Sequence, residues 1–167
     1  MKILPIIDTR RIGGAGQQLI PLVKSLKSEC DIPGVVVFNR QGSGPSEFIK
    51  ALESNGINPI VVNERWAIDP VALISLHKLL AKHDPDVVET HGYKASFFIF
   101  ILRCFRCVAK QTKWVAWIHG WTDENIKVKM YNTIGNLSVI FADLIICVSK
   151  SLSEKISAPR KKNLGRP

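Results

Sequence analysis

The sequence predicts an α/β fold, a Rossmann-like parallel sheet of about six strands with helices on both faces. Two observations carry this prediction. Short apolar runs alternate with segments whose apolar residues recur at helical spacing, with roughly 25–30 residues in each strand-helix unit. The runs are solidly apolar rather than alternating, which is typical of parallel strands buried on both faces. The expected strands are residues 3–7, 34–38, 58–62, 86–90, 114–118 and 144–148.

The segments between these strands carry helix signals. The first helix is expected to begin near Ala15 and to bend at Pro21, because proline costs least close to the first turn of a helix. Asp69 and Pro70 predict a helix start, as the capping residue and the first helical residue. The apolar face of that helix is expected to contain Leu73, Leu76, His77 and Leu80. Further helices are expected over residues 45–54, 94–108, 124–142 and 149–157.

Length and composition describe one globular domain. The chain has 167 residues, of which 46% are hydrophobic and 22% charged, unlike a disordered chain. We expect a domain over residues 1–157, followed by a basic tail or the start of an interdomain linker over residues 158–167. The N-terminus does not read as a signal peptide. The most apolar run, residues 97–102, is far below the ~18–20 residues that span a bilayer and is interpreted as part of a buried helix.

The cysteines do not form the pattern of a disulfide framework. Cys104 and Cys107 have the spacing of a metal or redox pair, but no second pair or histidine cluster completes a site. We therefore expect no metal, and reduced thiols in the cytoplasm.

The net charge of +9 is unevenly distributed. Residues 90–122 contain no acidic side chain, and residues 150–167 are strongly basic. One interpretation is an anionic partner, for which we expect a membrane surface at the inner face rather than nucleic acid. The other is a solvated basic face that aids solubility. The basic residues of the acid-free block are Lys94, Arg103, Arg106, Lys110 and Lys113.

Three loops that follow predicted strands are candidates for binding. In an open parallel sheet, ligands bind beyond the carboxyl ends of the strands. Gly13 and Gly14 precede a helix, so their N–H groups could approach an anion, although a tight turn that needs glycine is an equal alternative. The loop is not a nucleotide fingerprint, because it lacks the third glycine of the pattern and no acidic residue closes the second strand.

His91 and His119 each end an apolar strand and precede a glycine. An imidazole at that position could act as a base, or it could form a hydrogen bond to a sugar or phosphate oxygen. A single histidine there is more often structural, but two at matching positions on adjacent strands favour a ligand role. His77 and His83 are interpreted as structural.

Together these pieces resemble the N-terminal domain of family-4 glycosyltransferases, the retaining enzymes of the GT-B fold. The resemblance runs from about residue 2 to residue 156, nearly the whole chain. Its marks are Gly13-Gly14-Ala15, Asp84-Pro85-Asp86-Val87-Val88 leading to His91-Gly92, Ile118-His119-Gly120, and Ala142-Asp143-Leu144-Ile145-Ile146 followed by Val148-Ser149.

The resemblance implies one half of a GT-B fold, in which two Rossmann-like domains face each other across a cleft. The N-terminal domain chiefly binds the acceptor and the C-terminal domain binds the sugar nucleotide, with no further cofactor. By resemblance, Gly13 and Gly14 would approach the donor diphosphate, and His119 would sit at the reaction centre as the catalytic candidate. The acceptor side would be lined by His91, Tyr93 and Trp121.

The sequence departs from the family in one respect. The family's C-terminal domain carries a basic pair and two glutamates separated by seven residues, and no two glutamates here have that spacing. We expect a chain truncated before the donor-binding domain and inactive alone.

The expected function is therefore the acceptor-side domain of a hexosyltransferase-class enzyme in surface polysaccharide biosynthesis. Its expected partners are a nucleotide-sugar donor and a sugar or lipid-linked acceptor. Two alternatives remain open. One is a non-enzymatic module that binds an anionic surface or glycan, and the other is half of another GT-B enzyme, such as a sugar-nucleotide epimerase.

Overall fold

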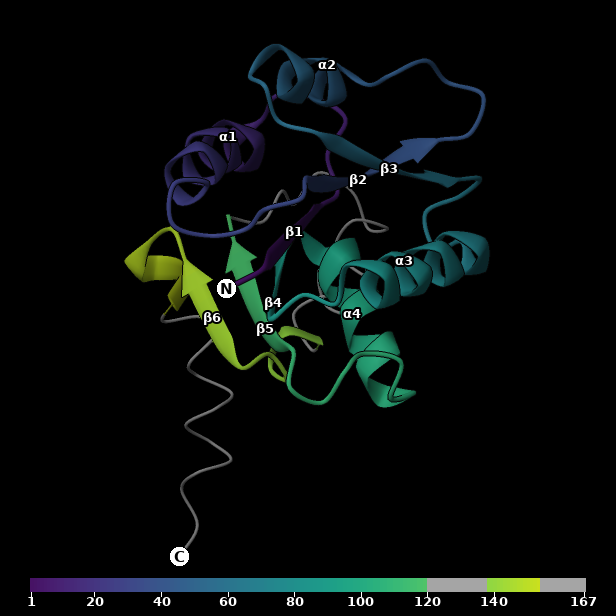
Figure 1. Cartoon of the computed structure of the whole chain (residues 1–167), viewed down its shortest axis with the longest axis vertical. Coiled ribbons are helices and arrows are strands. Elements are labelled where there is room, and N and C mark those ends of the chain that lie inside the picture. The colour runs from purple at the N-terminus through teal and green to yellow at the C-terminus, as the bar shows by residue number, and fades with distance from the viewer. Residues whose placement is uncertain (120–137, 154–167) are drawn as a thin grey trace, which may run out of the picture.

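The computed structural model describes residues 1–119 and 138–153. Within these ranges the predicted fold class is confirmed, because parallel strands form one six-stranded sheet in the order β3-β2-β1-β4-β5-β6 (Figure 1). The strands are β1 (Ile3–Ile7), β2 (Val35–Arg40), β3 (Pro59–Glu64), β4 (Val87–His91), β5 (Lys113–Ile118) and β6 (Leu144–Cys147). The helices with full bounds are α1 (Gly14–Leu26), α2 (Glu47–Ser54), α3 (Pro70–His83) and α4 (Tyr93–Cys104).

The strand order places β1 in the interior of the sheet, between β2 and β4. The chain first builds outward from β1 to β3, then returns through α3 to place β4 on the other side of β1. This reversal is the topological switch point of a Rossmann-like sheet, and ligands of such sheets bind in the crevice at the carboxyl ends of the strands on either side of it.

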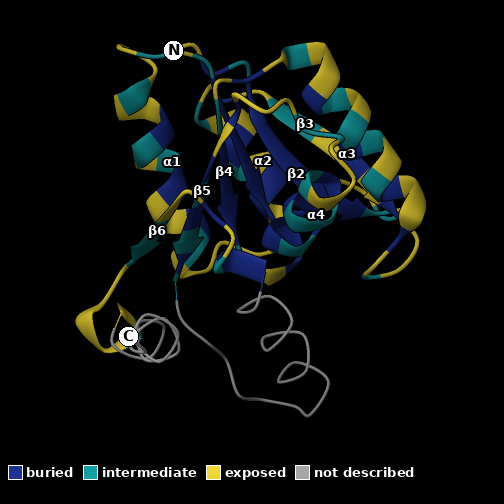
Figure 2. Cartoon of the chain, turned by 90° about the horizontal axis from the view of Figure 1, so that it is seen from below, coloured by how far each residue is buried: buried dark blue, intermediate teal, exposed yellow. Residues whose placement is uncertain are grey.

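The sheet is buried between two layers of helices (Figure 2). Successive residues of a strand point to opposite faces, so β1 contributes to both layers. Leu4 and Ile6 belong to a core cluster shared with α3 and α4. Ile3 and Ile7 belong to a second cluster, shared with α1 and α2. This two-sided burial explains why β1 is apolar at every position.

Helix α1 packs closely against α2 through a glycine. A Cβ atom on Gly16 would lie 2.7 Å from the ring of Phe48, which is fully buried on α2. Pro21 lies inside α1, as predicted. The missing side chain at position 16 therefore sets how near the two helices approach.

The start of α3 also agrees with its sequence signal. The Oδ1 atom of Asp69 accepts the N–H of Val71 at 2.8 Å, and its Oδ2 atom accepts the N–H of Arg65 at 2.8 Å. The N–H of Arg65 is the main reason why the pKa of Asp69 lies below its usual value. Pro70 occupies the first helical position, where a missing N–H costs nothing.

Helix α4 ends at Cys104, earlier than the predicted residue 108. Arg106 has a φ of 55°, in the left-handed region. The N–H of Cys107 donates to the carbonyl of Leu102 at 2.7 Å, and the N–H of Arg106 donates to that of Arg103 at 3.0 Å. This is a Schellman motif, which usually has glycine at the left-handed position. Because arginine occupies that position here, the sequence carries no stop signal.

Two further predictions concern the remaining segments. The helix expected over residues 124–142 lies mostly outside the described residues, although Ser138 and Val139 are helical and Ile140 is already in a turn. The basic tail of residues 158–167 also lies outside them. Across residues 1–119 and 138–153, the structure contains no helix with the length and apolarity needed to cross a membrane.

Candidate functional site

The carboxyl ends of β1, β4 and β5 meet at one edge of the sheet, at the switch point. The register pairs Ile7 with His91 and His91 with Trp117. Beyond β1, the N–H of Asp8 donates to the carbonyl of His91 at 3.2 Å. His119 follows the end of β5. The structure therefore brings Asp8, His91 and His119 to the edge where a parallel sheet binds ligands.

A buried lysine joins this edge together. The Nζ atom of Lys94, at the start of α4, lies 2.8 Å from Asp8 Oδ1 and 2.8 Å from Glu64 Oε2. The exposed fractions are 6% for the Lys94 side chain, 8% for Glu64 and 20% for Asp8. The same ammonium lies 4.5 Å from the centroid of the Phe38 ring, in a cation–π contact. One side chain thus ties the ends of β1 and β3 to the start of α4.

Sequence reasoning missed this cluster because it assigned Lys94 to a surface block of positive charge. A signal did exist. Asp8 and Glu64 both stand at the carboxyl ends of apolar strands, where the topology brings them to one edge. Two carboxylates at that edge predict a cation beside them, because burying an unpaired charge costs about 3–5 kcal/mol of folding free energy.

The two predicted histidines touch each other. His91 Nδ1 lies 2.9 Å from His119 Nε2, and His119 Nδ1 lies 3.0 Å from Oε1 of Gln18 on α1. The rings of His91 and His119 are stacked, with centroids 5.2 Å apart, and the ring of Trp117 stacks on His91 at 5.6 Å. His91 is 1% exposed, whereas His119 is half-buried. His119 therefore connects the end of β5 to α1, with His91 beneath it.

This environment keeps His119 uncharged. Burial is the larger cause and repulsion by His91 the second, and together they lower the pKa of His119 from 6.5 to about 4. At neutral pH the imidazole is therefore the neutral form, which can donate one hydrogen bond and accept one.

Three buried polar atoms near this pair have no hydrogen-bond partner. They are Glu89 Oε2, His91 Nε2 and Trp117 Nε1. Glu89 Oε2 lies 3.9 Å from His91 Nε2, which is beyond hydrogen-bond distance. Unpaired buried groups are uncommon, and sequence reasoning did not identify Glu89 as part of the site.

The glycine loop lies before α1, on the same edge. Gly13 has a φ of −95°, and neither Gly13 nor Gly14 adopts a left-handed conformation. A Cβ atom at either position would have no atom within 4 Å. The turn itself therefore does not require glycine, and the exposed backbone of these two residues is open to close approach.

The remaining predicted site residues are Tyr93 and Trp121. Tyr93 is the first residue of α4, next to Gly92, and 37% of it is exposed. Trp121 lies outside the described residues. Within the described ranges, no group of three or more metal-binding side chains is placed to hold an ion.

Comparison with known proteins identifies the family. Residues 12–161 match the sequence model of Glycosyltransferase Family 4. The chain belongs to glycosyltransferase family 4. The match covers both histidine loops and the glycine loop. A search of curated protein sequences found no match to this chain.

Solved GT-B proteins share the fold of this family-4 domain. HepE of Anabaena, crystallised with UDP and also with UDP and glucose, is 19% identical in the UDP complex, with a TM-score of 0.71, over 99% of this chain and 42% of HepE. The lipopolysaccharide outer core galactosyltransferase WaaB is 16% identical, with a TM-score of 0.70, over 95% of this chain and 42% of WaaB. A UDP-N-acetylglucosamine 2-epimerase is 19% identical, with a TM-score of 0.66, over 98% of this chain and 45% of the epimerase.

At these identities the likeness shows the fold alone. The chain spans about two-fifths of the length of the first of these structures, of which it covers 42%. The matched region corresponds to one half of a GT-B protein.

Proposed function

We propose that this chain is the acceptor-side domain of a retaining glycosyltransferase that uses a nucleotide-sugar donor. The observation that carries the proposal is the contact between His119 and Gln18, with 3.0 Å between Nδ1 and Oε1. It holds a neutral imidazole against α1, the helix that begins at Gly14. The reaction-centre candidate and the diphosphate-binding candidate thus lie on adjacent elements at the switch point. UDP complexes of HepE support a nucleotide-sugar donor.

Each part of the site has a proposed role. The N–H group of Gly14, at the positive end of α1, would stabilise the diphosphate as the leaving group gains charge. The N–H group of Gly13 would have to leave the carbonyl of Arg11, to which it donates at 2.9 Å, in order to do the same. His119 would lie beside the transferred sugar. Tyr93 and Trp121 would contact the acceptor directly. His91 is 1% exposed, so it would act through its contact with His119.

The proposed reaction needs a second domain on the other side of the cleft. In the resemblance to GT-B enzymes, the groups that bind the nucleotide sugar belong to a C-terminal domain. We propose that transfer occurs only when such a domain, in the same polypeptide or another, covers the carboxyl edge of this sheet. The purified 167-residue chain would then be inactive alone.

We also propose that the domain works at an anionic membrane surface on the cytoplasmic side, with a sugar or lipid-linked acceptor. Fewer basic side chains of the acid-free block are available at the surface than the sequence suggests, because Lys94 is buried and Arg103 pairs with Asp143 at 2.7 Å. Arg106 and Lys110 remain exposed, and together with His77 they line a surface hollow of about 640 Å³. Phe105 in the same loop is 76% exposed. An apolar side chain among cations favours a lipid surface.

A second candidate function is half of a sugar-nucleotide epimerase, and the fold likeness to a UDP-N-acetylglucosamine 2-epimerase favours it. Product analysis separates the two, because an epimerase changes the sugar nucleotide without any acceptor, whereas a transferase needs one.

Amide NMR of the full chain tests the diphosphate site. UDP and pyrophosphate should shift the N–H signals of Gly13 and Gly14 and the imidazole signals of His119. Adenine, which lacks the diphosphate, serves as the control ligand. Shifts confined to the loop after α4, or none at saturating UDP, would overturn the assignment of the glycine loop.

A further inference from the structure

The outer edge of β3 is open at one side of the sheet. Among the described residues, β2 is its one neighbouring strand. The carbonyl of Asn58 accepts the N–H of Val35 on β2 at 2.9 Å, so the even-numbered residues of this strand direct their backbone groups to β2. The residues between them direct theirs outward. The outward groups are the N–H and C=O of Val61 and Asn63, because Pro59 has no N–H to offer.

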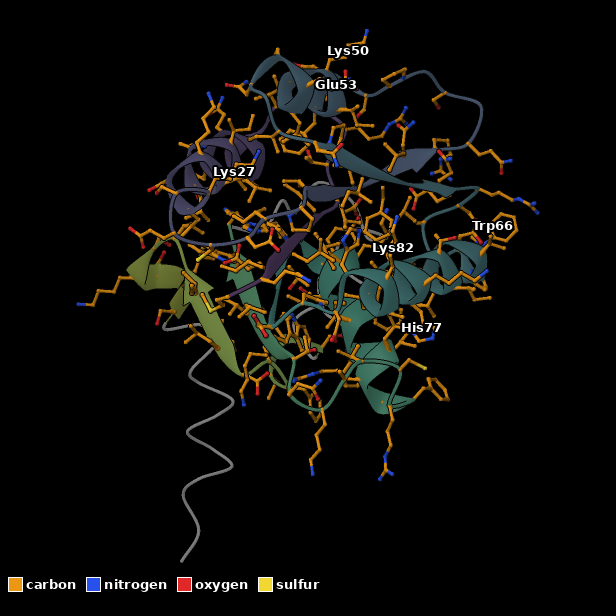
Figure 3. The ribbon with its side chains drawn as sticks, in the orientation of Figure 1. Lys27, Lys50, Glu53, Trp66, His77 and Lys82 are labelled. Carbon is orange, nitrogen blue, oxygen red and sulfur yellow. The ribbon has the colours of Figure 1, made fainter. Side chains whose placement is uncertain are left out.

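A groove lies between this edge and α3. It is a surface hollow of about 440 Å³, and its lining includes Val61 on β3 and Val71 and Leu79 on α3. Figure 3 shows Trp66, which is 54% exposed, at one end of α3. The large apolar side chains exposed on these elements and on the loop between them are Val61, Trp66, Ile68, Val71 and Ile74. Exposed apolar side chains gathered in this way mark an interaction surface.

The charged side chains of the groove are mainly basic. Arg65, Lys78 and Lys82 line it, and all three are exposed. None of the three forms an ion pair with another described residue. The one acidic residue in the lining is Asp69, which is 1% exposed and whose two carboxylate oxygens accept the N–H groups of Arg65 and Val71. The groove therefore favours an occupant that brings carboxylates.

We propose that this groove binds an extended acidic segment of a partner protein, which adds as a strand to the outer edge of β3. The backbone of the segment would pair with the N–H and C=O groups of Val61 and Asn63. Alternate side chains of a strand point to the same face, so one set would face α3. Apolar members of that set would contact Val71, and acidic members would lie near Lys78 and Lys82.

Two other occupants fit the groove less well. The hydrocarbon region of a bilayer offers no hydrogen bonds, so it would leave the outward backbone groups of Val61 and Asn63 without partners. A second copy of this chain would place the basic side chains of both copies in one interface, because a two-fold interface joins the same surface on each copy. An acidic strand avoids both costs.

Selection from a displayed library of short random peptides on the full 167-residue chain tests the proposal. Enriched peptides should alternate apolar residues with aspartate or glutamate. One such peptide, titrated into the ¹⁵N-labelled protein, should shift the amide signals of β3 and α3 and slow the hydrogen exchange of the Val61 and Asn63 amides. No enrichment, enrichment of basic peptides, or shifts confined to other elements would overturn the proposal.

Methylation of the peptide's own backbone tests strand addition without changing the protein. Only every second N–H of an added strand faces β3. Methylation of that set should abolish binding, and methylation of the other set should not. Equal effects of the two sets would overturn the proposed pairing.

Variants of the chain test both sides of the groove. Asn63→Pro removes one outward N–H without removing a hydrogen bond to β2, so it should weaken peptide binding about tenfold, whereas Asn63→Ala should not. Lys78→Glu should also weaken binding about tenfold, because it turns attraction into repulsion. Lys50→Glu, the same change on an exposed residue of α2, is the matched control. Equal affinities of Lys78→Glu and Lys50→Glu would overturn the proposal.

Two sedimentation measurements identify the other occupants. Trp66→Ser should leave binding to vesicles of phosphatidylglycerol and phosphatidylcholine unchanged, and a loss would assign the groove to a lipid surface instead. Self-association that Ile74→Asp removes would assign it to a second copy, and either result would overturn the proposal. The groove shares no residue with the histidine and glycine loops, so its failure would leave the proposed function unaffected.

Discussion

The ammonium of Lys94 contacts the carboxylate of Asp8 at 2.8 Å, which joins the start of α4 to the end of β1. The same ammonium contacts Glu64 at the end of β3. These elements flank the switch point, so a single side chain shielded from water sets the spacing of the edge where His119 and the glycine loop lie. The geometry of the site therefore depends on a residue that need not touch a ligand.

Lys94→Met should destabilise the domain severely. The variant keeps most of the side-chain volume but leaves Glu64 buried without a cation and Asp8 with one contact fewer. Breaking a buried ion pair by removing one partner costs about 3–5 kcal/mol. Urea unfolding followed by circular dichroism measures the loss. Lys110→Met, an exposed lysine, is the control and should change stability by less than about 0.5 kcal/mol. A loss equal to that of the control would contradict a stabilising role for the cluster.

Gly16→Ala should destabilise the contact between α1 and α2. The added methyl would lie 2.7 Å from the ring of Phe48, which is fully buried. Overpacking of this kind costs about 1–3 kcal/mol. Gly14→Ala tests the same change at the first residue of α1, where no atom lies within 4 Å, and should be neutral or stabilising. Thermal unfolding of both variants decides, and equal midpoints would refute the packing argument.

His119 should make stability depend on pH. Its folded-state pKa of about 4 lies below the ordinary 6.5, so the unfolded chain binds this proton more tightly. The stability it contributes is complete above about pH 6.5 and is lost as the pH falls toward 4. Urea unfolding at about pH 7.5 and pH 5 should show a smaller loss for His119→Gln than for wild type. Parallel losses in both proteins would mean that other groups cause the dependence.

The purified 167-residue chain should not transfer sugar. Its sheet forms one wall of the proposed cleft, and the chain covers 42% of HepE. Incubation with a panel of nucleotide sugars and of sugar and lipid-linked acceptors, followed by mass spectrometry, tests this. Sustained turnover that His119→Ala abolishes would show that this domain transfers sugar without a C-terminal domain.

The chain should bind anionic vesicles in preference to neutral ones, with binding that weakens as salt rises. Each basic residue near a charged surface contributes about 1 kcal/mol, screened over about 8–10 Å. Arg106→Glu should reduce vesicle sedimentation, and so should Lys110→Glu. Lys50→Glu, on α2 at the far end of the molecule from His77, is the control with a matched charge change (Figure 3). Equal sedimentation with both lipids would leave the basic block as a solubilising face.

The sequence predicted the strands and the edge that carries the site, because both follow from local patterns. A solid apolar run predicts a strand buried on both faces, and the polar residue that follows it falls at the carboxyl edge. His91 and His119 were placed this way. The end of α4 was not, because Arg106 fills a position where glycine is the usual signal.

Contacts within the site were beyond the reach of local patterns. The pairing of Lys94 with Glu64 depends on which strands lie near α4, and the pairing of His91 with His119 depends on β4 lying beside β5. Spacing along the chain gives neither. Glu89 was missed because a single acidic residue inside an apolar strand does not form a recognisable sequence pattern.

The interior position of β1 affects how the protein is made. β1 pairs on one side with β2, which follows soon after it, and on the other with β4 at residues 87–91. During synthesis, the second side of β1 stays unpaired until α3 and β4 have left the ribosome. An open strand edge is a site for wrong pairing with other chains, and long-range parallel pairing is slow. A nascent chain that stalls before residue 87 would therefore present an apolar edge for aggregation or for chaperone binding.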